Sequence, residues 1–256
     1  MRSNCRVCGT PLISAQFSGK LLGQKVDYFD CGICGYVQTQ EPTWLNLAYA
    51  SAINNCDTGI MLRNQTNVGV VLATLATLNN RFGRVVDCAG GYGILVRLLR
   101  DHGVDALWSD PYCKNLLAIG FEHHGENACL VTAFEAFEHF VKPQDELERL
   151  FVIAPNILLS TEIIASPAPM QSDWWYYGPE HGQHIGFFRV HTLSHLAKYF
   201  GKNLLTDGRS YHLLSQEPVS KLHWRLNRRL VQYWPQLFTR GMKSKVWPDY
   251  LQMRKS

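Results

Sequence analysis

The middle of the chain alternates between two hydrophobic periods, one typical of buried strands and one typical of helices. Short β-branched apolar runs predict strands at 84–87, 104–110, 129–134, 156–164 and 211–215. Apolar positions at helical spacing predict helices at 45–53, 64–79, 93–99, 143–151, 192–200 and 221–237. Strands that alternate with helices in this way indicate an α/β fold whose parallel sheet carries helices on both faces.

The same pattern divides the chain into four segments. We expect a small cysteine-bearing module at 1–42, a helical link at 43–82, the α/β domain at 83–215 and a basic helical segment at 216–256. Within the link, residues 57–63 are polar and contain a glycine, so they form either a lid over a ligand or a plain connector.

Composition is that of a folded protein. Hydrophobic residues make up 46% of the 256 residues and charged residues 18%, which suits a packed core and excludes wholesale disorder. No apolar run approaches the ~20 residues of a membrane span, and no apolar stretch follows the N-terminus as in a secretory signal. We therefore expect a cytoplasmic protein whose eight cysteines are metal ligands and buried thiols.

The N-terminal module carries two Cys-x-x-Cys pairs separated by 22 residues, and a glycine follows each pair. Two such pairs supply four soft thiolates, the donor set of a tetrahedral structural zinc site. Because four thiolates leave no open coordination position, we assign this zinc to folding and not to catalysis. The predicted ligands are Cys5, Cys8, Cys31 and Cys34. The remaining cysteines are scattered and are predicted to be buried thiols: Cys56, Cys88, Cys113 and Cys129.

The first strand of the α/β domain runs into a glycine-rich turn that opens a helix. Gly90, Gly91 and Gly93 let the backbone pass close to a ligand where a Cβ would collide. With Asp87 and Ala89, the turn resembles the Asp-x-Gly-x-Gly-x-Gly motif of class I methyltransferases, with Ala89 in place of the first glycine. The resemblance implies a Rossmann-like sheet and a turn that passes the amino-acid part of S-adenosylmethionine.

An acidic residue, Asp110, ends the next strand about 20 residues after the glycine turn. An acid at this place accepts hydrogen bonds from both ribose hydroxyls in dinucleotide-binding folds, so we predict that Asp110 binds the cofactor. Residues 111–128 leave little room for a crossover helix and a strand. Either the helix is abbreviated or the strand, at 117–121, is very short, and the adenine contact is left unassigned.

Acidic and imidazole side chains follow the strand at 129–134 at once. In doubly wound sheets the chemistry takes place at the carboxyl ends of the strands. The segment resembles the Phe-Glu-x-x-Glu-His phrase that follows this strand in many methyltransferases. We assign Phe134 and Glu135 to cofactor binding and Glu138 and His139 to catalysis; alternatively, the last two only cap and brace the turn.

Four adjacent aromatic residues precede a loop rich in glycine and histidine. Such a run is poor core material, whereas aromatic faces beside His and Glu suit a sugar ring or another flat, hydroxylated acceptor. In the loop, His181 and His184 are candidate general bases, with a metal-binding and a purely structural role as alternatives. The predicted substrate-binding residues are Trp174, Trp175, Tyr176, Tyr177 and Glu180.

The cysteine module, the cofactor turn and this loop together resemble the sugar C-methyltransferases of deoxysugar biosynthesis. Those enzymes carry a Tyr-His-Glu-His run here, whereas this chain has His181, Gly182, Gln183 and His184, so that only the last His is kept. The resemblance implies His184 as general base and methyl transfer to a sugar, nucleotide sugar or glycan, on carbon or on a hydroxyl. Such a transfer requires alignment of the acceptor and removal of a proton.

The C-terminal segment is strongly basic. From residue 221 onward, nine Lys or Arg stand against one acid, a balance of +8, and the first 220 residues carry −4 of the overall +4. We expect one face of the 221–237 helix to pack on the body, with Arg225, Arg228 and Arg229 beside it. That face is formed by Leu222, Leu226, Leu230, Tyr233 and Leu237. The alternatives are an anionic contact with a membrane surface, RNA or a phosphorylated substrate.

Methyl transfer to a small hydroxylated acceptor is therefore the leading prediction, and two others remain. An RNA methyltransferase would bind RNA through the cysteine module and the basic C-terminal segment, although the net negative charge of residues 1–220 disfavours this. A non-catalytic, zinc-stapled scaffold would have lost cofactor binding, for which Ala89 and the cramped 111–128 stretch are weak indications.

Overall fold

The computed structural model describes residues 3–49 and 57–255. The chain forms two compact units, each assembled from three stretches of sequence. Unit 1 comprises Met1–Asn54, Glu135–Arg149 and Leu159–Leu214, and unit 2 comprises Asn55–Phe134, Leu150–Leu158 and Ser215–Ser256. Cys56 and the end of the helix predicted at 45–53 lie outside the described residues.

Unit 1 holds the N-terminal strands and the aromatic loop. Its strands are β1 (Ser3–Asn4), β2 (Pro11–Leu12), β3 (Phe17–Leu21), β4 (Gln24–Asp30), β5 (Val37–Thr39), β10 (Gly186–Phe187), β11 (Asn203–Thr206) and most of β12 (Tyr211–Ser215). Its helices are α1 (Leu45–Ala48), α5 (Val190–Tyr199) and three 3-10 turns, η1 (Phe137–His139), η2 (Gln171–Asp173) and η3 (Trp175–Tyr177).

Unit 2 holds the cofactor turn and the basic C-terminal segment. Its elements are α2 (Ile60–Thr77), β6 (Val85–Cys88), α3 (Ile94–Asp101), β7 (Ala106–Ser109), β8 (Leu130–Phe134), α6 (Lys221–Tyr233), α7 (Pro235–Phe238) and α8 (Val246–Met253). Helix α4 (Pro143–Ile153) and strand β9 (Ile157–Ser160) each contribute residues to both units.

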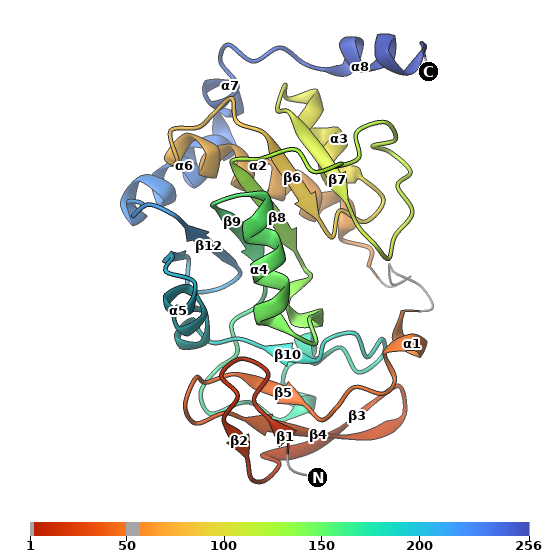
Figure 1. Cartoon of the computed structure of the whole chain (residues 1–256), viewed down its shortest axis with the longest axis vertical. Coiled ribbons are helices and arrows are strands. Elements are labelled where there is room, and N and C mark those ends of the chain that lie inside the picture. Colours follow the sequence, from red (N-terminus) through yellow and green to blue (C-terminus); the bar gives the residue numbers. More distant parts are fainter. Residues whose placement is uncertain (1–2, 50–56, 256) are drawn as a thin grey trace. The chain divides into compact units, whose positions relative to one another are not determined.

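A parallel ladder at the centre of unit 2 carries the predicted cofactor turn (Figure 1). Strand β6 pairs in parallel with β7 on one side and with β8 on the other. The full strand order of the sheet is β11-β12-β9-β8-β6-β7. The predicted α/β fold with a parallel-rich sheet and flanking helices is therefore confirmed, and β9 is shorter than the strand predicted at 156–164.

The segment from 111 to 128 contains neither a helix nor the strand predicted at 117–121. Residues 117–120 form a turn instead, and Glu122 makes an isolated parallel bridge with Trp108 at the edge of β7. The expected crossover helix is thus abbreviated to turns, because too few residues separate β7 from β8.

A four-stranded antiparallel sheet with the order β10-β5-β4-β3 organises unit 1 (Figure 1). Strand β10 comes from the end of the aromatic loop, and it pairs Gly186 with Gln38 and Phe187 with Val37. The loop is thereby tied by backbone hydrogen bonds to the N-terminal strands, far away in sequence.

Two of the four residues of the aromatic run lie in the core of unit 1, so the expectation that the run is poor core material was wrong for them. Tyr176 and Tyr177 are fully buried, in a cluster with Tyr28, Trp44 and Phe187. The ring of Tyr28 lies 5.1 Å from that of Tyr177 in an edge-on contact. The N-terminal sheet supplies an apolar surface that no local sequence pattern reveals.

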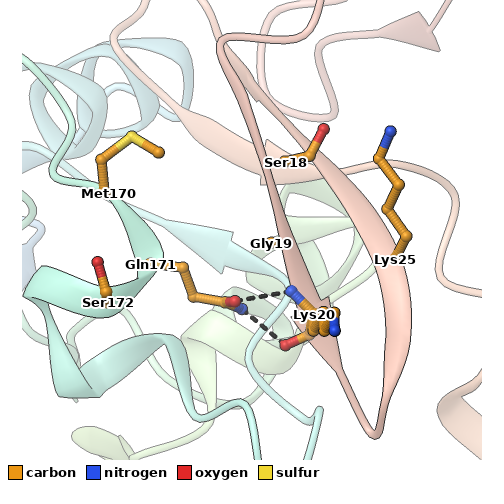
Figure 2. A pocket seen from close by; sticks show the side chains of 7 residues that line it. All are labelled: Ser18, Gly19, Lys20, Lys25, Met170, Gln171 and Ser172. Carbon is orange, nitrogen blue, oxygen red and sulfur yellow. Dashed lines mark hydrogen bonds between the residues drawn. The ribbon is translucent and has the colours of Figure 1, made fainter.

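The outer edge of β3 is covered by a glutamine side chain (Figure 2). Gln171 Oε1 accepts the backbone N–H of Lys20 at 2.7 Å, and its Nε2 donates to the Lys20 carbonyl at 2.9 Å and to the Tyr28 hydroxyl at 2.9 Å. A Cβ on Gly19 would lie 2.4 Å from Oε1, so a side chain at this position would displace the amide. The shallow pocket around it contains none of the predicted site residues.

Helix α6 packs on α2 through a different face from the one predicted. Trp224 and Val231 are buried, and Trp224 Nε1 donates to the Thr74 hydroxyl at 3.0 Å. The leucine face that we expected to pack on the body is largely exposed, with Leu222 and Leu226 among the exposed residues. The large indole on the opposite face outcompetes the leucine stripe for burial against α2.

An ion-pair network joins α8 to α3 within unit 2. Asp249 is buried and accepts from Arg100 at 2.7 Å on both carboxylate oxygens, and from Arg97 at 2.6 Å. Among the described helices, none is both long and apolar enough to cross a membrane.

Candidate functional site

The turn between β6 and α3 adopts a left-handed backbone at three positions. Ala89, Gly91 and Gly93 have φ angles of +67°, +52° and +86°, in the region that favours glycine. A Cβ on Gly93 would lie 2.9 Å from the backbone nitrogen of Ala118, so the turn tolerates no side chain there. Ala89 is exposed and keeps this conformation despite its methyl group, at a cost in backbone strain.

Asp110 holds the glycine turn from the end of β7. Its Oδ2 accepts the N–H of Gly91 at 3.0 Å, and its Oδ1 accepts the N–H groups of Tyr112 and Cys113 at 2.8 and 3.0 Å. Trp108, on the same strand, donates from Nε1 to the Gly91 carbonyl at 2.9 Å. A carboxylate has about four acceptor positions, so Asp110 keeps capacity for a ligand hydroxyl while it fixes the turn.

Asp87 is a buried carboxyl group on β6. The Thr132 hydroxyl donates to its Oδ1 at 2.6 Å. Burial raises the pKa of Asp87 to about 7, the Thr132 hydrogen bond acts in the opposite direction, and the nearby charge of Asp110 raises the pKa further. Asp87 therefore titrates near neutral pH.

The chain leaves β8 through a strained residue. Glu135 has a φ of +49°, its N–H donates to Ser160 Oγ at 2.9 Å, and the Ser160 hydroxyl donates to Glu135 Oε1 at 2.6 Å. Such strain is concentrated at functional sites. Phe134 is buried at the last position of the strand, and the cofactor-binding role of both residues stays a prediction.

Glu138, His139 and His184 form a cluster within unit 1. Oε1 of Glu138 lies 3.8 Å from Nε2 of His139 and 3.9 Å from Nε2 of His184. Nδ1 of His184 donates to the Tyr176 carbonyl at 2.5 Å, and Nδ1 of His139 shares a 3.0 Å hydrogen bond with the Tyr49 hydroxyl. The turn η1 and the loop before β10 thus bring together three of the four residues predicted to be catalytic.

The protonation state of this cluster follows from its partners. A carbonyl only accepts, so the proton of neutral His184 is on Nδ1 and its lone pair is on Nε2. Nε2 of His139 is buried and has no hydrogen-bond partner among the described residues. Burial lowers the pKa of His184 to about 4, and burial followed by the neighbouring imidazoles lowers the pKa of His139 well below its usual range. Both rings are neutral at pH 7.

The fourth candidate, His181, is half-buried beside the cluster. Its ring centroid lies 4.7 Å from that of His184, and its Nδ1 accepts the N–H of Gln183 at 3.1 Å. Burial lowers the pKa of His181 to about 4.

The predicted substrate residues separate into two groups. Tyr176 and Tyr177 are fully buried, and the Tyr177 hydroxyl donates to the Pro169 carbonyl at 2.9 Å. Trp175 is 75% exposed and Glu180 is exposed, while Trp174 is half-buried. Only these last three offer surface to an acceptor, and their role stays a prediction.

The four cysteines of the N-terminal turns converge. Sγ of Cys5 lies 3.5 Å from that of Cys34, Sγ of Cys8 lies 3.5 Å from that of Cys31, and all four sulfurs lie within 4.8 Å of one another. A disulfide would place two sulfurs about 2.05 Å apart. A tetrahedron of Zn–S bonds of 2.3 Å places them about 3.8 Å apart, so the donor set fits zinc.

Each cysteine turn closes on a glycine in the left-handed region. Gly9 and Gly35 have φ of +73° and +71°, and their N–H groups donate to the carbonyls of Cys5 and Cys31 at 2.8 Å. Arg6, between two predicted ligands, donates to the Thr39 and Gln40 carbonyls at 2.8 and 2.7 Å. The first turn is therefore anchored to the end of β5.

The other described cysteines differ in burial. Cys88 is buried, as predicted, whereas Cys113 and Cys129 are only half-buried. The prediction of a buried thiol was therefore wrong for these two, since both lie next to turns at the edges of the ladder.

Sequence reasoning missed three residues that shape these sites: Trp108, Thr132 and Tyr49. Asp87 is in register with Trp108 on β7 and with Thr132 on β8. Aligning the carboxyl ends of the three predicted strands would have indicated both neighbours. No comparable signal pointed to Tyr49, which reaches His139 across more than 80 residues of sequence.

A parallel α/β sheet with a glycine turn after its first strand and an acid after its second defines a class of nucleotide-cofactor proteins. A family model described as a methyltransferase domain matches residues 61–207. The chain therefore belongs to this methyltransferase-domain family.

The solved structures that match this chain are distant from it in sequence. Magnesium protoporphyrin IX methyltransferase from Synechocystis PCC 6803, with bound SAH, is 15% identical over 66% of this chain and 90% of its own, with a TM-score of 0.46. Human N-acetylserotonin methyltransferase in complex with SAM is 16% identical over 60% and 52% of the two chains, with a TM-score of 0.43. An O-methyltransferase family protein from Burkholderia thailandensis is 13% identical over 61% and 58%, also with a TM-score of 0.43. No curated protein sequence matches this chain.

Proposed function

We propose that this chain transfers a methyl group from S-adenosylmethionine to a hydroxyl-bearing small molecule. Membership of the methyltransferase-domain family supports the reaction. The observation that carries the cofactor assignment is the left-handed turn after β6, whose Gly91 N–H is held 3.0 Å from the Asp110 carboxylate. When bound, S-adenosylmethionine supplies an electrophilic methyl group on a sulfonium ion.

The chain's own residues fit this cofactor. The exposed turn lets a ligand approach the backbone at Ala89 and Gly91, and Asp110 retains acceptor capacity for a ribose hydroxyl. A Cβ on Gly90 would lie 2.6 Å from the Trp108 ring, so this position also requires glycine. The residues that would hold the cofactor are Asp87, Ala89, Gly90, Gly91, Gly93, Asp110, Phe134 and Glu135.

Proton removal from the acceptor is assigned to the cluster around Glu138. His184 is the first candidate, because the Tyr176 carbonyl fixes its tautomer and leaves a lone pair on Nε2. His139, His181 and Glu138 lie beside this ring. General-base catalysis of this kind contributes about 10²–10⁴-fold to a rate.

The acceptor that we propose is a sugar, a nucleotide sugar or a glycan. The resemblance of the His181–His184 loop to sugar C-methyltransferases supports it, with an imidazole at the last position. The exposed indole of Trp175 and the exposed carboxylate of Glu180 suit a hydroxylated ring.

We further propose that Cys5, Cys8, Cys31 and Cys34 hold a structural zinc ion. The sulfur separations fit a tetrahedral ion, and the backbone N–H groups of Val7 and Cys8 support the Cys5 sulfur. Four thiolates leave the ion no open position, so it contributes to folding only.

The acceptor assignment is tested with labelled methyl groups. Zinc-loaded protein is incubated with methyl-labelled S-adenosylmethionine and a panel of nucleotide sugars, and labelled products are separated by chromatography. We expect transfer to a hydroxylated sugar, reduced about 10²-fold or more in His184→Gln. The control is His195→Gln on α5, which we expect to retain activity. Cofactor binding without transfer to any sugar would reject this acceptor class.

A further inference from the structure

A second group of metal-ligating side chains exists in unit 1, apart from the four cysteines. The ligand atoms of Glu138, His139 and His184 lie within 4.8 Å of one another. Within residues 3–49 and 57–255, these two groups are the ones in which at least three such side chains converge. The loop histidines alone had offered no third ligand from sequence, and Glu138 and His139 now complete the set.

The spacing of the three atoms suits a single ion. Two of the separations are 3.8 and 3.9 Å, and the third is at most 4.8 Å. A point equidistant from three such atoms lies roughly 2.2–2.5 Å from each, against metal–nitrogen and metal–oxygen bonds of about 2.0–2.2 Å. Side-chain movements of a few tenths of an ångström would bring all three ligand atoms to bonding distance from one ion.

The Nδ1 atoms of both imidazoles have hydrogen-bond partners of the kind found at metal-binding histidines. A ligating His commonly donates its other ring N–H to a carbonyl or shares it with a neighbouring polar group, which fixes the ring. Nδ1 of His184 donates to the Tyr176 carbonyl, and Nδ1 of His139 is hydrogen-bonded to the Tyr49 hydroxyl. The Nε2 atoms of both rings lie beside the carboxylate of Glu138, and that of His139 is buried without a hydrogen bond in the described residues.

We propose that Glu138, His139 and His184 bind a divalent first-row transition metal such as Zn²⁺, Co²⁺ or Fe²⁺. Two imidazoles and one carboxylate favour these ions, whereas Mg²⁺ and Ca²⁺ prefer oxygen ligands alone. Three protein ligands leave at least one coordination position open, the arrangement of a catalytic site and not of a structural one. This ion is distinct from the zinc of the four cysteines.

The open coordination position would bind the hydroxyl group of the methyl acceptor. This identification of the ligand rests on the proposed function. An ion held by Glu138, His139 and His184 would act as a Lewis acid and lower the pKa of a hydroxyl group bound at its open position. In the metal-bound protein Nε2 of His184 would be a ligand, so the general-base role proposed above for this atom applies to the metal-free protein. Metal binding itself requires neither the cofactor nor the acceptor.

Cobalt uptake by the full, zinc-loaded chain tests the site. Co²⁺ is added, unbound metal is removed, and zinc and cobalt are counted by mass spectrometry. We expect one zinc and one cobalt per chain, with weak visible absorption and no thiolate-to-cobalt charge transfer. No retained cobalt, or cobalt with thiolate charge transfer in place of the zinc, would overturn the proposal.

Variants assign the cobalt to the cluster. We expect His139→Ala and His184→Ala to bind cobalt at least about tenfold more weakly while they keep their zinc. The control is His195→Ala on α5, which removes an imidazole outside the cluster and should retain one cobalt. Unchanged affinity in both ligand variants would refute the assignment.

A measurement on the unaltered chain covers the case in which a variant does not fold. Electron paramagnetic resonance of the cobalt-loaded protein, with ¹⁵N-labelled histidine, should show coupling to two imidazole nitrogens. The absence of imidazole coupling contradicts the site. Titration with S-adenosylhomocysteine on the same sample reports the cofactor proposal separately, so either proposal can fail alone.

A different observation concerns the outward face of α6. Trp224 and Val231 pack inward on α2, and Asn227 donates to the Thr77 hydroxyl at 2.9 Å. Helical spacing places an apolar stripe on the opposite side, and it continues into α7. The exposed members of this outer stripe are Leu222, Leu226, Tyr233, Trp234 and Leu237.

Basic residues flank the outer stripe. Arg225 and Arg229 are exposed and lie one helical step to its side, within a segment whose balance of charge is +8. An apolar stripe with an indole and a basic border is the pattern of a helix that lies in the plane of a membrane interface. We infer that the outer stripe binds the surface of an anionic phospholipid bilayer.

Vesicle sedimentation of the full chain tests this second inference. We expect binding to phosphatidylcholine vesicles that contain phosphatidylglycerol and little binding to phosphatidylcholine alone. Leu226→Gln/Tyr233→Gln should abolish it, and Arg225→Gln should weaken it about fivefold at low salt, since one basic residue near such a surface contributes about 1 kcal/mol. The charge-matched control is Arg149→Gln, an exposed arginine on α4.

Three results would overturn the membrane inference. They are equal binding to both kinds of vesicle, undiminished binding by the stripe variant, and absence of vesicle binding, whether or not the same residues bind RNA or mediate self-association.

Discussion

At the scale of single residues, the cofactor turn holds two features that an ordinary turn would avoid. Ala89 keeps a left-handed backbone with a φ of +67°, and Asp87 is a buried carboxyl group whose pKa is raised to about 7. Both residues lie where β6 ends, at the turn for which we propose cofactor binding. Strain and shifted ionisation of this kind persist where the surrounding structure enforces them.

Replacing Ala89 with glycine should stabilise the protein. The left-handed conformation costs an L-residue about 1–2 kcal/mol, and the added flexibility of the unfolded chain offsets part of the gain. We expect Ala89→Gly to raise the free energy of unfolding by about 0.5–1 kcal/mol in urea denaturation. The control Ala76→Gly, inside α2, should lower it by about 1 kcal/mol. A decrease in the free energy of unfolding of Ala89→Gly as large as that of the control would contradict backbone strain at Ala89.

Asp87 should make stability depend on pH in a specific direction. Its folded pKa of about 7 lies above the unfolded value of about 3.9, so the folded state binds the proton more tightly. Its stabilising contribution is full below pH ~4 and is lost as the pH rises to about 7.

The comparison of wild type with Asp87→Asn isolates this effect. Urea denaturation at several pH values should show the free-energy advantage of wild type over the variant falling between pH ~4 and ~7. The neighbouring Asp110 is present in both proteins, so its own titration largely cancels. A difference that is flat or rises over this range contradicts the raised pKa of Asp87.

At the scale of secondary-structure elements, local patterns predicted what local residues determine. The strand β6, the glycine turn, α3 and the acid after β7 follow each other in sequence, and all were located from it. The aromatic run was misjudged because its burial depends on strands β3, β4 and β5, more than 130 residues away. The outer stripe of α6 was misjudged because Trp224 on the other face packs on α2.

The attachment of α8 to α3 depends on one buried carboxylate. Asp249→Ala would leave Arg100 buried beside the Phe121 ring without its bidentate partner. We expect a loss of about 3 kcal/mol in the free energy of unfolding. The control Asp101→Ala breaks the exposed pair with Arg97 and should cost less than 1 kcal/mol. Equal losses in urea denaturation would argue against the buried network.

At the scale of the whole molecule, each unit carries its own candidate chemistry. The cofactor turn and Asp110 belong to unit 2, whereas the four cysteines and the Glu138 cluster belong to unit 1. The fold class and the cofactor turn could be predicted from sequence, because their signals are contiguous. The three-residue cluster could not, because the fold brings His184 to η1 from a distant loop.

Removal of zinc should destabilise unit 1. Its cysteine turns are tied to β5 through Arg6 and to α5 through Arg189, which donates to the Gly35 carbonyl at 2.8 Å. We expect a strong chelator to lower the melting temperature and to weaken the near-ultraviolet circular dichroism of the aromatic core, with recovery when zinc is added. Metal-free protein with an unchanged melting temperature would show that the four cysteines do not need an ion.

The central claim, cofactor binding at the turn after β6, is tested most directly by calorimetric titration of zinc-loaded protein with S-adenosylhomocysteine. We predict one binding site per chain. Its affinity should be at least about tenfold weaker in Asp110→Ala, because this variant loses both a ribose contact and the hydrogen bond that holds the Gly91 N–H. The control Asp105→Ala, which removes the half-exposed partner of Arg84, should bind like wild type. Absence of binding by folded wild-type protein would contradict the account.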